Sequence, residues 1–151
     1  MATVYSNVAT IENAPTPPTL MEPNIIRGKV RAVSGHYTAA SLAASSIVRL
    51  CRLYKGDVVL MGGSWIGSED TLGSGVTVKV GDDDDTTAAD DDRYLAATSL
   101  ASAAVIQFND VTTALAKRPY VVQKDCWLIA TFSAHVITGD LRFEVQIATN
   151  N

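Results

Sequence analysis

Apolar and polar residues alternate with a period of two along most of the chain after residue 26. Val76, Val78 and Val80 alternate with Thr77 and Lys79, which is the spacing of a strand with one buried face. Residues 141–148 repeat this pattern, with four apolar side chains on one side and three polar side chains on the other. The predicted strands are 27–33, 47–54, 58–66, 76–80, 94–95, 120–123, 127–134 and 141–148.

Glycines and small residues mark the connections between these strands. Gly62-Gly63 predicts a bulge or sharp bend inside 58–66, and Gly139-Asp140 predicts a hairpin turn before the last strand. Two Ala/Ser-rich stretches, 39–46 and 96–104, are ambiguous, and we expect loops with at most one helical turn there. About eight short strands with turn signals between them indicate an all-β fold, a two-sheet β-sandwich of jelly-roll type.

Residues 1–25 differ from this body. They contain four of the five prolines, namely Pro15, Pro17, Pro18 and Pro23. Proline fixes φ and removes a backbone donor, so this segment is predicted to be an extended arm. The predicted organisation is therefore an arm over 1–25 and a β-sandwich domain over 26–151, and 151 residues suit a single core.

The acidic run GDDDDTTAADDDRY, residues 81–94, dominates the charge of the chain. It holds seven of the sixteen acidic residues, which leaves nine acidic against twelve basic residues elsewhere. Seven carboxylates cannot be desolvated together, so we expect the run to sit in water, on an ion or against a basic partner. Calcium is one candidate ion, with Asp82, Asp84 and Asp91 as ligands. The EF-hand pattern itself fails, because Thr86 and Thr87 occupy two of its required positions.

A second charged feature is the strand at 27–33, where Arg27, Lys29 and Arg31 fall on one face. This basic face on an adjacent copy is a candidate partner for the acidic run, and charge pairs of this kind orient subunits. Cys51 and Cys126 lie in apolar strand-like runs and are predicted to be reduced core thiols.

The sequence offers little for catalysis. Neither CxxC nor HExxH occurs, no phosphate-binding loop is present, and His36 and His135 are far apart in sequence. Gly62-Gly63-Ser64 superficially resembles a nucleophile elbow, but the final glycine is missing. We therefore expect no enzyme and no cofactor. The pI of about 5.0 disfavours nucleic-acid binding.

The chain also lacks features of secreted and membrane proteins. No apolar run approaches the roughly 20 residues that span a bilayer, and the N-terminus has no basic start or apolar core of a secretory signal. We expect the protein to be made and to stay in a cytoplasm, or to be carried out inside something larger. Trp65 and Trp127 are expected in the core, although an exposed tryptophan would favour a sugar-binding face.

The order of these features is informative as a whole. The arm leads to a basic strand (IIRGKVRAV), then to an apolar strand with a lysine-glycine turn (IVRLCRLYKGDVVLMGG). A valine strand then enters the acidic run (VTVKVGDDDDTTAADDDRYLAATSLASA). This order resembles the auxiliary head proteins of tailed bacteriophages, small structural proteins encoded near the major capsid protein. The resemblance implies a β-sandwich or jelly-roll fold and no catalytic residues.

The sequence thus predicts a virion structural protein, a capsid decoration or cement protein that stabilises the shell. Its partners would be the major capsid protein and neighbouring copies in a homo-oligomer. The arm prolines and the basic strand would make these contacts. The protein would lie at the capsid surface, after assembly in the host cytoplasm. The alternative is a head-fibre, neck or tail component that binds host glycan or protein. A calcium-dependent sensor or enzyme remains a third hypothesis, which would require stabilisation by calcium.

Overall fold

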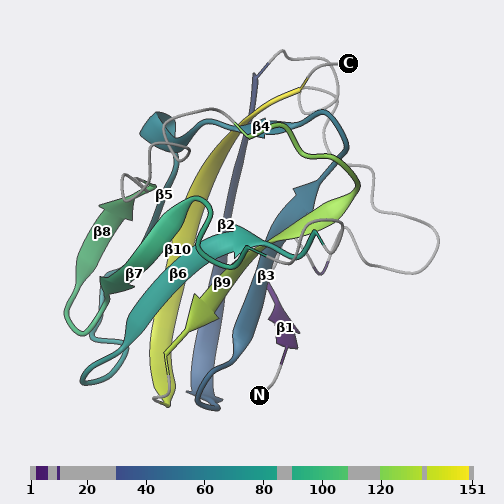
Figure 1. Cartoon of the computed structure of the whole chain (residues 1–151). Coiled ribbons are helices and arrows are strands. Elements are labelled where there is room, and N and C mark those ends of the chain that lie inside the picture. Colours follow the sequence, from purple (N-terminus) through teal and green to yellow (C-terminus); the bar gives the residue numbers. More distant parts are fainter. Residues whose placement is uncertain are drawn as a thin grey trace.

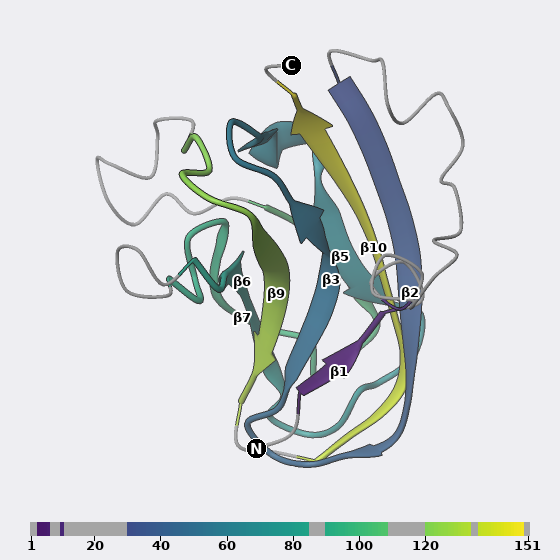
Figure 2. The ribbon, with the colours of Figure 1, turned by 90° about the vertical axis from the view of Figure 1, so that its right-hand side faces the viewer.

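The computed structural model describes residues 3–6, 10, 30–84, 90–108, 120–133 and 136–149. Two five-stranded β-sheets face each other across one core, which confirms the predicted β-sandwich. Figure 2 shows the two layers, with β3 and β9 in one and β2 and β10 in the other. Figure 1 shows the element labels along the chain.

The first sheet, sheet A, has the order β1-β3-β9-β6-β7. Its strands are β1 (Thr3–Tyr5), β3 (Ile47–Leu53), β9 (Cys126–Phe132), β6 (Thr77–Asp82) and β7 (Leu95–Ser99). The last four pair antiparallel, whereas β1 pairs in parallel with the edge of β3. Sheet A thus gains an extra strand from the predicted N-terminal arm.

The second sheet, sheet B, has the order β2-β10-β5-β8, with a short β4 beside β10. Its strands are β2 (Val30–Leu42), β10 (Ile137–Ala148), β5 (Trp65–Ser68), β8 (Ala104–Gln107) and β4 (Val58–Val59). Between β4 and β5, the 3-10 turn η1 (Met61–Gly63) makes the bend that Gly62-Gly63 predicts.

The strand order identifies the type of sandwich. Without β1 and β4, the eight main strands form four nested antiparallel pairs, and successive pairs lie in alternate sheets. The pairs are β2-β10, β3-β9, β5-β8 and β6-β7. The first main strand lies beside the last, and the second lies beside the second from last. This wrapping of a long hairpin on itself is the jelly-roll topology, as the sequence predicted.

Alternating side chains of the strands fill the core. In β10, Leu141, Phe143, Val145 and Ile147 are all buried, as the period-two pattern predicts. Cys51 and Cys126 are buried free thiols, which confirms their predicted reduced state. Desolvation raises the pKa of Cys126 to about 12, with the neighbouring carboxylate charges adding to the effect.

Three local predictions were wrong. Residues 39–42 and 96–99, expected as loops, belong to strands β2 and β7, because long antiparallel neighbours pair with them. Gly139-Asp140 is no hairpin turn but lies inside β10, where Gly139 has a φ of 111° at a register shift. Residues 120–123 contribute only an isolated bridge from Val121 to Val58.

Candidate functional site

Most residues of the predicted arm contact lie outside the described residues, namely Pro15, Pro17, Pro18, Pro23, Arg27 and Lys29. Their role in partner binding stays a prediction. Arg31 is the one member of the basic strand that the structure describes, and its position differs from the expectation.

The side chain of Arg31 points into the protein instead of forming an exposed basic face. Only 5% of this side chain is exposed, and its guanidinium lies 3.1 Å from the carboxylate of Asp57. The same nitrogen donates to the carbonyl of Arg52 at 2.9 Å, and the guanidinium lies over the Tyr54 ring. In β2, Arg31 shares its face with the core residue Val33. Arg31 therefore holds β2 against the turn after β3.

The acidic run is anchored by basic and hydrogen-bonding groups of its own chain. The Asp82 carboxylate is fully buried and accepts from Arg93 Nε at 2.7 Å and from the Tyr94 hydroxyl at 3.2 Å. Desolvation raises the pKa of Asp82, and the Arg93 charge opposes this shift. The prediction overlooked this option, because it considered only water, an ion or an external partner.

The neighbouring carboxylates are also engaged. Asp83 accepts from the backbone N–H of Trp127 at 2.6 Å and lies 3.3 Å from the guanidinium of Arg49. The Tyr120 hydroxyl donates to Asp84 at 3.3 Å. Further along, Lys79 lies 3.3 Å from Asp91. These contacts fasten both described ends of the acidic run to sheet A.

The geometry does not support the calcium site suggested at Asp82, Asp84 and Asp91. Within the described ranges, no three or more Asp, Glu, His or Cys side chains gather in a way that could hold a metal ion. Two of the three carboxylates face protein hydroxyls or a guanidinium, and the third faces an ammonium group.

The N-terminal strand β1 is seated on the outer face and edge of sheet A. Its residues pair with Ile47, Val48 and Arg49 of β3, and the N–H of Ser6 continues the ladder to the carbonyl of Arg49 at 2.8 Å. The Tyr5 ring meets the Trp127 ring edge-on, with centroids 5.8 Å apart. β1 is thus held both by backbone pairing and by an aromatic contact.

Arg49 connects this N-terminal strand with the acidic run. Its guanidinium donates to the Tyr5 hydroxyl at 2.7 Å and lies about 5 Å from the centres of the Tyr5 and Trp127 rings. It also faces Asp83. Trp127 is only 8% exposed, because these groups and Arg52 cover it. We call the groups that receive β1, namely the edge of β3 with Arg49 and Trp127, the strand-docking site.

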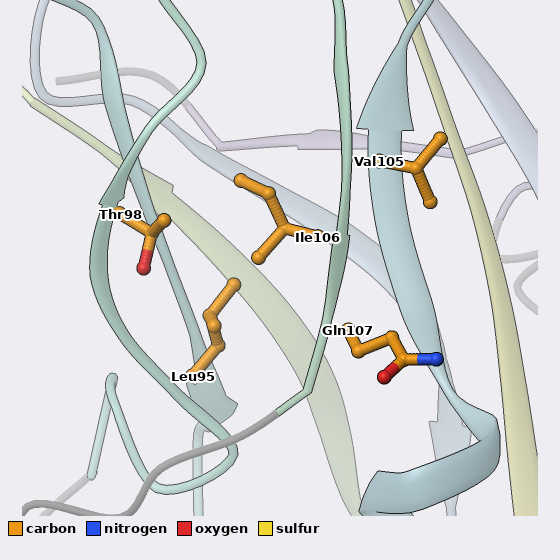
Figure 3. A pocket seen from close by; sticks show the side chains of 5 residues that line it. All are labelled: Leu95, Thr98, Val105, Ile106 and Gln107. Atoms are coloured by element: carbon orange, nitrogen blue, oxygen red, sulfur yellow. The ribbon is translucent and has the colours of Figure 1, made fainter.

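β7 and β8 form the opposite side of the sandwich. These strands form the free edges of the two sheets (Figure 1). A cleft of about 590 Å³ lies between them, and Leu95, Thr98 and Ile106 point toward one another across it in Figure 3. Val105 beside it is 69% exposed. Among the described residues, no further strand pairs with the outer edge of β7 or of β8.

Of the residues considered for catalysis, the structure describes Ser64 and His36. The Ser64 hydroxyl is buried, donates to the carbonyl of Leu60 at 2.8 Å and accepts from the N–H of Gln146 at 3.0 Å. It is therefore not an exposed nucleophile. His36 lies on the outer face of sheet B, and His135 lies outside the described residues.

The similarity of this chain to known proteins lies in its structure. No protein-family model matches the chain, and no curated protein matches its sequence. A chain in the capsid of Ralstonia phage GP4 matches with a TM-score of 0.66 at 17% identity, over 99% of both chains. A chain in the cyanophage Pam1 capsid asymmetric unit matches with a TM-score of 0.55 at 17% identity, over 91% of this chain and 97% of that one.

A third match comes from the acid-stable capsid of the Helicobacter pylori bacteriophage KHP30. Its TM-score is 0.51 at 13% identity, over 81% of this chain and 89% of that one. The chain shares the fold of phage capsid chains. Identities this low establish the fold and nothing finer. Among the residues that the structure describes, no helix has the length and apolar character needed to cross a membrane.

Proposed function

We propose that this chain is a bacteriophage virion structural protein that binds the capsid shell as a decoration or cement protein. The observation that carries the proposal is the end-to-end match with a chain of the Ralstonia phage GP4 capsid, which covers 99% of each chain. The match over the whole length supports a role in which the complete jelly roll is one building unit.

The architecture supports this role independently. A shell-binding protein needs a rigid body, and the two sheets supply it through one continuous core. It also needs segments that join neighbours. Strand β1 docks by edge pairing, a mode that the same edge can offer to a strand from another chain.

The link between the N-terminal strand and the body allows such an exchange. Residues 11–29 join Thr10 to Val30, and 19 residues can reach at most about 65 Å when fully extended. β1 could therefore occupy the strand-docking site of its own body or that of a neighbouring copy. The partners proposed are the major capsid protein and other copies of this chain. We propose no enzymatic activity and no nucleic-acid partner.

The first test is a copy-number measurement by quantitative mass spectrometry on purified particles, relative to the major capsid protein. Hundreds of copies per particle would support a lattice-covering decoration or cement protein. About a dozen or fewer would indicate a vertex, neck, fibre or tail component. Absence from particles would refute a virion role.

The second test concerns the N-terminal segment. Deletion of residues 1–20 should abolish binding to capsids that lack this protein, while the sandwich stays folded by circular dichroism. Tyr5→Ala, which removes the aromatic contact with Trp127 and the hydrogen bond with Arg49, should weaken binding in the same direction. Full binding by the truncated protein would disprove the contact role of the arm.

A further inference from the structure

The outer face of sheet B carries a polar pocket that the proposed shell-binding role does not use. Strand pairing places Arg142 of β10 between His36 of β2 and Gly67 of β5. One step along β10, Glu144 lies between Ser34 and Trp65. Figure 2 shows β2, β10 and β5 side by side in this sheet. Three strands distant in sequence therefore bring charged, hydroxyl and aromatic side chains to one surface.

A hollow of about 490 Å³ lies on this face. His36 and Thr38 line it from β2, Asp140 and Arg142 line it from β10, and Trp65 lines it from β5. The volume lies within the roughly 300–1,000 Å³ typical of small-molecule sites.

The two tryptophans of the chain differ in their surroundings. Trp127 is covered by Tyr5 and two arginines and is nearly buried. Trp65 is partly exposed and borders the hollow. Its cross-strand neighbours are Glu144 on one side and Gln107 on the other. An indole that is partly open to solvent among polar groups offers a flat apolar surface next to hydrogen-bonding groups.

Two polar groups around the hollow are available to a ligand. The Oδ1 atom of Asp140 is shielded from solvent and accepts no hydrogen bond from the described residues, an arrangement that carries a desolvation cost. A donor brought by a ligand would relieve this cost after a small side-chain shift. Arg142 pairs with Glu69 at 2.8 Å, but both side chains are more than half exposed. Such a pair is weak and can exchange for a ligand contact.

We propose that this hollow, the Trp65 pocket, binds a neutral sugar unit of a glycan. A hexose has one face of C–H groups, which can stack on the indole, and hydroxyls that both donate and accept. Arg142 is a donor, Asp140 is an acceptor, and the hydroxyl of Thr38 can act as either. On and beside the pocket, the positive charge of Arg142 is outnumbered by three acidic side chains, Asp140, Glu144 and Glu69. This balance disfavours an anionic sugar.

The site follows from sheet B alone and does not depend on the shell-binding proposal. The test uses the full-length protein on an array of neutral and acidic oligosaccharides. The neutral oligosaccharides that bind on the array are then titrated by calorimetry. Maltotriose and lactose, which are neutral, and sialyllactose, which is acidic, are titrated whatever the array shows. Binding of neutral oligosaccharides is the expected result, with sialyllactose no tighter than lactose.

Variants connect binding to the pocket. Trp65→Ala and Asp140→Asn should each weaken neutral-sugar binding by about tenfold, which equals about 1.4 kcal/mol. Asparagine keeps one acceptor oxygen at position 140, but it loses the second oxygen and the stronger, charge-assisted hydrogen bond of the carboxylate. Tyr54→Ala, which removes an exposed aromatic ring outside the pocket, should leave binding unchanged. Asp140→Asn is isosteric, so it remains informative if the tryptophan variant misfolds. Trp127→Phe leaves Trp65 as the sole indole, and its fluorescence should change on sugar addition.

Four outcomes would overturn the proposal. The first is no binding of any neutral oligosaccharide on the array. The second is binding that survives both Trp65→Ala and Asp140→Asn in folded protein. The third is a clear preference for acidic sugars. A fluorescence change in Trp65→Phe instead of Trp127→Phe would likewise place the sugar at another site.

Discussion

Replacement of Arg31 by methionine should destabilise the protein strongly, because it leaves the buried carboxylate of Asp57 without its ionic partner. Both side chains are only 5% exposed, and their charged atoms lie 3.1 Å apart. Loss of one member of a buried ion pair costs about 3–5 kcal/mol in the free energy of unfolding. Asp57 retains the backbone N–H of Tyr54 as a donor at 3.0 Å. We therefore expect the lower end, about 3 kcal/mol.

The measurement is urea denaturation followed by tryptophan fluorescence, supported by thermal unfolding. For a domain of this size, each kcal/mol corresponds to about 2–4 °C in Tm, so Arg31→Met should lower Tm by about 6–12 °C. The double variant Arg31→Met with Asp57→Asn should recover part of the loss, with a coupling energy of about 1–3 kcal/mol. Asparagine keeps an acceptor for Tyr54 while it removes the orphaned charge.

Arg142→Met is the matched control. Arg142 also belongs to an ion pair of sheet B, at 2.8 Å from Glu69, but its side chain is 51% exposed and that of Glu69 is 72% exposed. A pair in solvent is worth less than about 1 kcal/mol. The reasoning fails if Arg31→Met costs no more than Arg142→Met, because burial would then not determine the strength of these pairs.

Three further outcomes are expected. Burial raises the pKa of the Cys126 thiol from 9.0 to about 12, so between these pH values the unfolded chain loses this proton while the folded protein keeps it. The contribution of Cys126 to the free energy of unfolding is therefore complete below pH 9 and is lost as the pH rises toward 12. Urea denaturation of Cys126→Ala across this pH range should lack this part of the decline. Asp83→Ala removes the acceptor of the Trp127 N–H and should cost about 1–3 kcal/mol in the same assay, and a loss as small as that of Arg142→Met would contradict this anchoring. Millimolar calcium should leave Tm unchanged in a thermal scan, because the described carboxylates form no metal site; a large rise would reinstate the calcium hypothesis.

The residue pattern determined the parts of this fold that depend on local periodicity. In β6, Val78 and Val80 are apolar and buried, and over residues 141–147 of β10 each second residue is apolar and buried. Turn signals and short strands were enough to predict the sandwich, because a chain of half-buried strands has few other ways to cover its apolar faces. The bend at Gly62-Gly63 and the buried cysteines were equally local features.

Only the tertiary structure decided which distant groups meet. The sequence placed Arg31 on a basic face, but pairing of β2 with β10 turns the Arg31 side chain inward, toward Asp57. The carboxylate of Asp82 is buried because Arg93 and Tyr94 fold back onto it. Equally, nothing local distinguishes Trp65, which borders a hollow, from Trp127, which β1 covers. Burial and pairing of polar groups depend on contacts across the sheets, and a local pattern does not contain those contacts.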